Sequence, residues 1–177
     1  KDLDYVCCLH EQAAAIAAES YAQHTNNIGV ALVTTGPGGT NTITGVSAAW
    51  IDSTPVIFIS GQVKRSDLMG SRGVRQMGPQ EVNIVPIVQS ITKYATTVTE
   101  PQKIKSILEE AYYLATTGRK GPVWIDIPLD VQAAEIDVDT LAEFVVQKED
   151  DTLDEELINK TKVSLEKAKR PLILAGN

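Results

Sequence analysis

Apolar residues in this chain gather in short continuous runs that alternate with helix-like segments. The runs at residues 28–34 (IGVALVT) and 56–60 (VIFIS) suit strands that are buried on both faces of a parallel sheet. An Ala-rich segment at residues 10–23 precedes the first run, and Ala is the strongest helix former. Between the runs, residues 40–51 predict a helix whose first residues, Thr and Asn, suit an N-cap. The order strand, helix, strand indicates a right-handed parallel crossover.

The same alternation continues further along the chain. Residues 80–81 are predicted to begin a helix, and residues 93–98 (KYATTV) and 121–128 (GPVWIDIP) to form two more strands. Residues 101–117 have apolar positions at helical spacing, and their opening Pro suits the first turn. Residues 63–78 contain three Gly and no periodicity, so we expect a mobile loop at the carboxyl edge of the sheet. The predicted fold is therefore α/β, with helices on both faces of a parallel sheet.

The last part of the chain has a different composition. Residues 133–152 are rich in acids and poor in apolar side chains, which is typical of a solvated linker. A helix is expected over about residues 153–168, followed by an apolar, strand-like run (KRPLILAGN). We therefore predict a domain over residues 1–132, a linker over 133–152 and the start of a second α/β domain over 153–177. Because the sequence starts abruptly, we also expect the first strand of the first domain to be missing.

Charge and composition narrow the range of functions. The formal net charge is −7, and no cluster of Lys and Arg suits the phosphates of a nucleic acid. No apolar run reaches membrane-spanning length, and no charged and apolar leader is visible. We therefore expect a cytoplasmic protein whose partners include neither nucleic acid nor membrane.

The chain has only two cysteines, the adjacent pair Cys7 and Cys8. Neighbouring cysteines rarely bridge each other, and the two His lack the spacing of zinc ligands. We predict no metal site among the residues of this chain. Cys7 and Cys8 are interpreted as small buried apolar residues near the end of a strand.

Two short motifs are candidates for chemistry. Glu11 stands at the start of the Ala-rich helix, and Gly36–Pro37–Gly38–Gly39 connects the first apolar run to the next helix. A carboxylate beside a turn without bulky side chains can hold and protonate a small flat heterocycle. Each motif also has an ordinary explanation: the helix dipole favours an acid in the first turn, and Gly-rich turns supply unusual backbone angles. The turn matches neither the dinucleotide-binding fingerprint nor the phosphate loop.

Taken together with the strand motifs, these residues resemble the amino-terminal, pyrimidine-binding domain of thiamine diphosphate enzymes. The most similar branch is the large catalytic subunit of acetolactate synthase. The resemblance covers about residues 5–132, and the run KRPLILAGN resembles the start of that family's central domain. It is carried by an ordered series of motifs: His10–Ala14, Ala22, Gly36–Gly38, Thr40–Asn41, Asp52–Ser53 with Pro55, Ile59–Gln62, Gln80–Glu81, Gly121–Val123 and Asp130–Gln132.

The resemblance implies roles for the motif residues. Glu11 would be catalytic: it would protonate, or donate a hydrogen bond to, ring nitrogen N1′ of the aminopyrimidine and so favour loss of the thiazolium C2 proton. Burial would have to raise the pKa of Glu11 for this proton sharing. Gln80 would approach the reacting side of the cofactor, or it would simply be a polar residue at a helix start. The expected cofactor-binding residues are Gly36, Pro37, Gly38, Asn41 and Gln80.

The family resemblance also implies a reaction and partners. The enzyme would decarboxylate pyruvate and join the product to a second 2-keto acid. The family's Gly-Asp-Gly motif for Mg²⁺ and diphosphate is absent from this sequence, so a later domain would supply it. A second copy of the same chain would complete the site in an obligate dimer or tetramer, and this chain alone would be inactive. The need for flavin adenine dinucleotide (FAD) and for a regulatory subunit stays open.

Two positions depart from the family pattern and keep other functions open. Pro79 stands where a Phe commonly precedes the Gln-Glu pair, and Leu129 where a Lys is common. Arg72 and Arg75 would either compensate as anion-binding residues or be solvated. One alternative is another thiamine diphosphate carboligase or decarboxylase, for example one acting on a modified sugar. A non-catalytic relative, disfavoured by Glu11, and a nucleotide-binding module without a phosphate-loop Lys are further alternatives.

Overall fold

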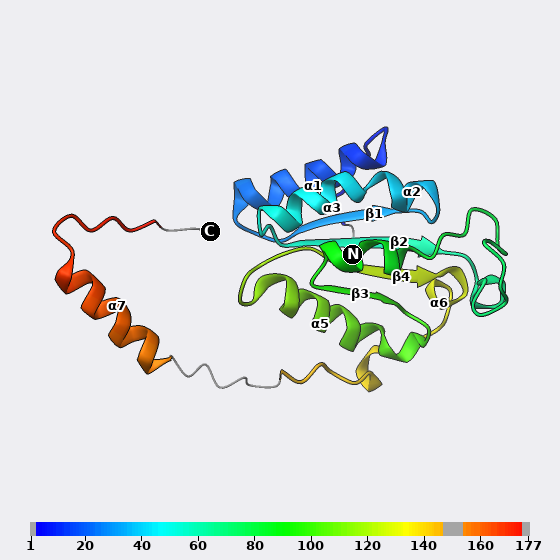
Figure 1. Cartoon of the computed structure of the whole chain (residues 1–177). Coiled ribbons are helices and arrows are strands. Elements are labelled where there is room, and N and C mark those ends of the chain that lie inside the picture. The colour runs from blue at the N-terminus through cyan, green and yellow to red at the C-terminus, as the bar shows by residue number, and fades with distance from the viewer. Residues whose placement is uncertain (1–2, 147–153, 175–177) are drawn as a thin grey trace. The chain divides into compact units, whose positions relative to one another are not determined.

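The computed structural model describes residues 3–146 and 154–174 of the chain. The chain divides into two compact units, Lys1–Phe144 and Val145–Asn177, which are described separately. Figure 1 shows the first unit as a sheet with helices above and below it. In the part of the chain described here, no helix has the length and apolar character needed to cross a membrane.

The described residues of the first unit contain one sheet of four parallel strands. The strands are β1 (Gly29–Val33), β2 (Val56–Gln62), β3 (Tyr94–Thr97) and β4 (Val123–Pro128), arranged in the order β1-β2-β4-β3. All four correspond to predicted strands, and the central strands β2 and β4 are largely buried on both faces, as their apolar runs indicate. The expectation was wrong for β1, an edge strand in which Val30 and Leu32 are exposed. The apolar run expected to form a further strand is not a strand at residues 170–174, and residues 175–177 lie outside the described part.

Helices cover both faces of the sheet, which confirms the predicted fold class (Figure 1). The helices α1 (Glu11–Thr25), α3 (Ile43–Ile51) and α4 (Ile84–Val88) contribute to one core, and α5 (Ile104–Thr116) contributes to the other. The first core contains the stacked rings of Phe58 and Trp124. The second is built from Ile57, Val98, Ala111, Ala115, Val123, Ile125 and Val131.

Helix α1 approaches its neighbours unusually closely. A Cβ at Gly45 of α3 would lie 2.6 Å from the Cβ of Ala15, and a Cβ at Gly29 would lie 2.1 Å from the carbonyl oxygen of Ala18. Only glycine fits at either position. The helix ends at Asn26, which has the left-handed φ of 55° expected for a C-cap.

The predicted helix over residues 40–51 is in fact two helices. The short helix α2 (Pro37–Asn41) begins directly after Gly36, and α3 follows it after Thr42. Thr40 and Asn41 are therefore inside α2 and are not caps of the longer helix. The break is at Thr42, whose hydroxyl donates a 2.6 Å hydrogen bond to the carbonyl oxygen of Gly39. Pro37 has no backbone N–H, but at the first position of α2 this removes no helical hydrogen bond, because first-turn N–H groups have no helical partner.

Residues 80–81 do not begin a helix, so this prediction was wrong. Gln80 has a positive φ of 60°, which an α-helix excludes, and α4 starts only at Ile84. The side chain of Glu81 accepts hydrogen bonds from the preceding loop instead of facing solvent at a helix start.

The interpretation of Cys7 and Cys8 was also wrong. Both side chains are exposed, and residues 3–10 form no strand. In the described chain no neighbouring element covers this segment, as the full exposure of Leu9 illustrates.

Residues 133–144, the first part of the predicted linker, are grouped with the first unit, and most of their side chains are exposed. After α6 (Leu129–Gln132), the ring of Phe144 packs against Tyr113 of α5, with 5.7 Å between ring centroids. The backbone N–H of Phe144 donates to Glu109 at 2.8 Å. Residues 147–153 of the predicted linker lie outside the described residues. In the second unit, α7 (Glu155–Lys167) is capped by the carboxylate of Asp154.

Candidate functional site

The first turn of α1 and the end of α2 bring Glu11 and Asn41 together. The side-chain amide of Asn41 donates a 3.1 Å hydrogen bond to Oε2 of Glu11. Helix α1 starts at this point because Nδ1 of His10 accepts a hydrogen bond from the backbone N–H of Gln12 at 3.1 Å. Glu11 is half-buried, so its carboxylate can still be reached from outside.

The glycine turn forms a wall of bare backbone beside this carboxylate. A Cβ at Gly38 would lie 2.7 Å from Cγ2 of Thr34 and 3.8 Å from Oε1 of Glu11. Gly36 has a φ of 66°, and a Cβ there would lie 2.3 Å from the carbonyl oxygen of Gln80. A side chain at Gly38 would reach the acid, whereas one at Gly36 would overlap the backbone of Gln80. The turn is therefore suited to close approach by a flat group.

The structure thus brings together most of the site residues expected from the sequence. Glu11, Gly38 and Asn41 are mutual neighbours, and Gln80 joins them through its contact with Gly36. Pro37 is exposed at the first position of α2. The side chain of Gln80 is exposed as well, so only its backbone is fixed by these contacts.

The electrostatics of Glu11 differ from the expectation. The hydrogen bond from Asn41 is the main cause that holds the pKa of Glu11 below its ordinary value, and the backbone N–H of Glu11 adds to it. We expected burial to raise this pKa. Desolvation does act in that direction, but the hydrogen bonds outweigh it because the carboxylate is exposed in the described chain. Glu11 is therefore ionised at neutral pH in this chain by itself.

Glu81 is a residue whose function the sequence did not reveal. It is only 4% exposed, and its carboxylate accepts hydrogen bonds from the backbone N–H groups of Met69 (2.5 Å), Met77 (2.8 Å) and Gly78 (3.2 Å). The carboxylate therefore closes the loop over residues 69–78. The Gln80–Glu81 motif marked this position in the sequence, but we interpreted the two residues as the start of a helix.

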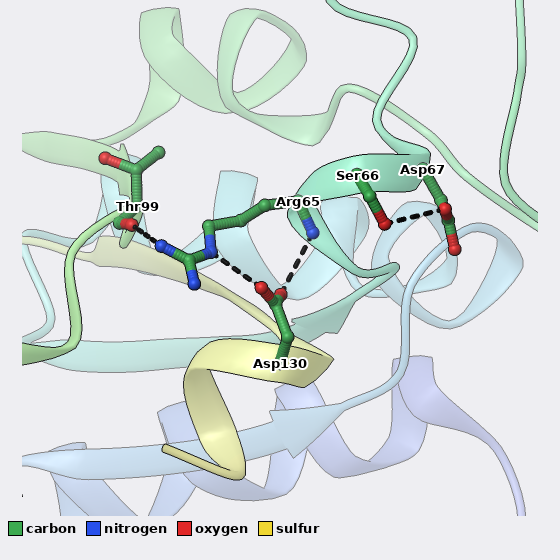
Figure 2. Close-up of polar contacts among 5 residues, drawn as sticks. All are labelled: Arg65, Ser66, Asp67, Thr99 and Asp130. Carbon is green, nitrogen blue, oxygen red and sulfur yellow. Dashed lines mark hydrogen bonds and ion pairs between the residues drawn. The ribbon is translucent and has the colours of Figure 1, made fainter. Parts of the chain in front are cut away.

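Arg65 holds the segment that leads into this loop, as Figure 2 shows. Its Nε and backbone N–H donate to the two oxygens of Asp130 at 2.7 and 2.9 Å, and Nη1 donates to the carbonyl oxygen of Thr99 at 2.8 Å. The backbone N–H and the guanidinium of Arg65 together hold the pKa of Asp130 below its ordinary value. Further along, Nη1 of Arg72 donates to the carbonyl oxygen of Leu68 at 2.5 Å, within the loop itself.

The described residues do not form a metal site of their own. Nowhere in residues 3–146 or 154–174 do three His, Cys, Asp or Glu side chains converge as metal ligands. The polar groups near the turn are instead a carboxylate and amides, which suit hydrogen bonding to a heterocycle.

Comparison with known proteins agrees with this geometry. Residues 1–87 match the family model described as "thiamine pyrophosphate enzyme, N-terminal TPP binding domain". The chain is 48% identical over 128 residues to an acetolactate synthase of Arthrospira platensis, covering 72% of this chain and 21% of the relative. It is 37% identical over 176 residues to the acetolactate synthase large subunit of Lactococcus lactis subsp. lactis, covering 98% of this chain and 30% of the relative. With the acetolactate synthase isozyme 2 large subunit of Escherichia coli (strain K12), identity is 35% over 174 residues, with the same shares.

This chain belongs to the family of thiamine pyrophosphate enzymes, through the domain that these enzymes carry at their amino terminus. Within the family its similarity is to acetolactate synthases, which confirms the resemblance seen in the sequence. The chain spans less than a third of the length of these curated relatives.

Proposed function

We propose that this chain is the pyrimidine-binding part of an acetolactate synthase-like enzyme. The complete enzyme would use thiamine diphosphate to decarboxylate pyruvate and to join the product to a second 2-keto acid. One observation carries the proposal: the Glu11 carboxylate lies beside the bare backbone of Gly38 and within hydrogen-bonding distance of Asn41. The similarity to acetolactate synthases supports the choice of reaction.

The residues at the turn fit an aminopyrimidine. A flat ring needs a wall without side chains, which Gly38 provides, and an acid at the edge of that wall, which Glu11 provides; Gly36 lets the turn pack directly against Gln80. When bound, thiamine diphosphate supplies a nucleophilic carbon that no protein side chain offers. Gly36, Pro37, Gly38 and Asn41 would line the pyrimidine pocket.

Glu11 would hold a shared proton at ring nitrogen N1′. The low pKa of Glu11 in this chain leaves it ionised, so the proton is held only if water is excluded from the carboxylate. A bound ring together with a second protein surface would provide this desolvation. We therefore propose that a second copy of the chain completes the site, in a dimer or tetramer whose assembly raises the pKa of Glu11.

The remaining parts of the enzyme are proposed from the resemblance. Mg²⁺ and the diphosphate group would be bound by a later domain, and residues 153–177 would start the central domain. Gln80 would face the reacting side of the cofactor. A cytoplasmic location remains a prediction, and the need for FAD or a regulatory subunit stays open.

A second candidate is a thiamine diphosphate enzyme with a different substrate. Leu129 is 52% exposed just after β4, and Pro79 is exposed next to Gln80. The family's substrate-side Lys and Phe are expected at these two positions. An apolar residue and a Pro would not provide the same contacts to a 2-keto acid, which favours a different donor or acceptor, such as a modified sugar.

The test uses the complete natural protein that carries this chain, with thiamine diphosphate, Mg²⁺ and pyruvate. Products are identified by mass spectrometry, with the protein lacking cofactor as the control. Acetolactate supports the proposed reaction. Release of carbon dioxide without acetolactate favours the second candidate, and failure to bind thiamine diphosphate contradicts both.

A further inference from the structure

Gln62, the last residue of β2, links three separate segments of the chain. Its Oε1 accepts a hydrogen bond from the hydroxyl of Thr35 at 2.8 Å. Its Nε2 donates to the carbonyl oxygen of Val82 at 2.9 Å and to Oδ2 of Asp126 at 3.0 Å. The residue is only 5% exposed, so all these contacts are inside the protein.

Two of the linked segments line the proposed cofactor site. Thr35 immediately precedes Gly36, and Val82 follows Gln80 by two positions. Gly36 and Gln80 already lie so close that a Cβ on Gly36 would be 2.3 Å from the carbonyl oxygen of Gln80. A single buried amide thus fixes both sides of this contact.

Asp126 determines how that amide is oriented. This carboxylate, in the middle of β4, is 2% exposed and accepts from the hydroxyl of Ser60 at 2.5 Å as well as from Gln62. An acceptor at Asp126 requires the NH₂ end of Gln62 on that side, which leaves its carbonyl oxygen for Thr35. The backbone N–H of Val63, which donates to the same oxygen at 2.9 Å, fixes the same orientation.

We propose that Gln62, oriented by Asp126, is a positioning residue that sets the Gly36 turn against the Gln80 segment for pyrimidine binding. The inference rests on the proposed function, because it assigns the purpose of the linkage to the cofactor site. An amide is needed there, since the position must accept from Thr35 and donate to two acceptors at once. A Glu could not donate to Asp126 and would place a second buried carboxylate beside it.

The competing explanation is that Gln62 is simply a buried polar residue with satisfied hydrogen bonds. In that case its loss would destabilise the domain without a local effect at the turn. Thr92 offers a matched control: it is buried, and its hydroxyl donates to the carbonyl oxygen of Val88 at 2.9 Å in a helix that does not include the turn. Gln62→Met and Thr92→Val each remove buried hydrogen bonds while keeping similar volume.

The experiment compares both variants with the wild type in the complete natural protein. Hydrogen–deuterium exchange is followed by mass spectrometry without cofactor, in peptides covering residues 34–42, 79–84 and 104–116. For Gln62→Met we expect exchange about tenfold faster in the first two peptides and unchanged exchange in the α5 peptide. At saturating thiamine diphosphate, kcat should fall roughly 10-fold to 100-fold, because small misplacements of a reacting group have large effects. Thr92→Val should leave the first two peptides and kcat near their wild-type values.

Several results would overturn the inference. Exchange that rises equally in all three peptides would show a general loss of stability, and a Gln62→Met protein with wild-type exchange and kcat would show no positioning role. If Gln62→Met does not fold, Thr35→Val removes only one donor and should produce the same local pattern with a smaller amplitude. Since exchange is measured without cofactor, failure of the wild type to bind thiamine diphosphate would contradict the proposed function separately.

Discussion

Two glutamates flank the Gly36 turn, and they are held in opposite ways. Glu81 is buried and accepts from three backbone N–H groups, whereas Glu11 is half-buried and has one side-chain partner, Asn41. The hydrogen bonds of the Glu81 carboxylate all stabilise the loop over residues 69–78. The Glu11 carboxylate keeps an accessible face and an adjustable pKa, which are what a ligand-binding acid needs. The environment of a carboxylate thus separates a structural role from a chemical one more clearly than the residue type does.

Glu11→Gln should produce the largest effect on chemistry. Removing the acid should slow C2 proton exchange of bound thiamine diphosphate in the complete protein by about 10²-fold to 10⁴-fold, the usual range for a lost general acid or base. The exchange is measured by NMR in D₂O. The exposed Glu135→Gln is the control and should exchange at the wild-type rate. Unchanged exchange in Glu11→Gln would contradict the assignment of Glu11.

Gly36→Ala should destabilise the turn on which the site is built. The alanine would have to keep the positive φ of 66°, which is strained for a residue with a Cβ. Its Cβ would also overlap the carbonyl oxygen of Gln80. We expect a loss of about 3 kcal/mol in the free energy of unfolding, at the upper end for a strained backbone position. Urea denaturation measures it. Gly118→Ala also has a positive φ but nothing within 4 Å of its Cβ, so it should lose less. Equal losses would mean that the contact with Gln80 is unimportant.

Glu81→Gln tests the structural glutamate of the pair. A neutral amide can accept fewer and weaker hydrogen bonds from Met69, Met77 and Gly78, so we expect a loss of about 2 kcal/mol in unfolding free energy. Limited proteolysis should cut within residues 69–78 sooner than in the wild type. If the rate of C2 exchange fell as far in Glu81→Gln as in Glu11→Gln, the distinction between the two glutamates would be lost.

The smallest effect is expected at the exposed pair of Arg65 and Asp130. Its contacts hold the pKa of Asp130 below the ordinary value of 3.8, so the pair stabilises the fold above that pH. This contribution is lost as the pH falls through the lower pKa of the folded state. Asp130→Asn should therefore be less stable than the wild type at neutral pH, and the difference should shrink in acid. A difference that is independent of pH would show that the charge of Asp130 is not involved.

Local patterns predicted the elements of the fold well. The strands β1, β2 and β4 follow continuous apolar runs, and α1 and α5 follow Ala-rich and amphipathic segments. The errors occurred where a tertiary contact, or the lack of one among the described residues, overrides local preference. The backbone at Gln80 adopts a positive φ, and the segment around Cys7 is not buried by any of the residues that the structure describes.

The candidate site was predicted only in part. The meeting of Glu11, Gly38 and Asn41 followed from the family resemblance and not from spacing alone. The low pKa of Glu11 could not be foreseen, because it depends on a hydrogen bond from a residue thirty positions away. Gln62 and Asp126 stand in strand motifs of the sequence, but neither was assigned a role, since each looks like a polar position within an apolar strand.

The close seating of α1 has a mechanical consequence. At Gly29 and Gly45, the backbone of the neighbouring element packs directly against α1. No flexible side chain separates them that could change its rotamer and let the helix shift. The backbone of α1 is therefore held in a fixed position, and the position of the Glu11 carboxylate depends only on the rotamer of its own side chain. Changes elsewhere in the protein can reshape the loop over residues 63–78 and still leave Glu11 at a fixed height above the sheet.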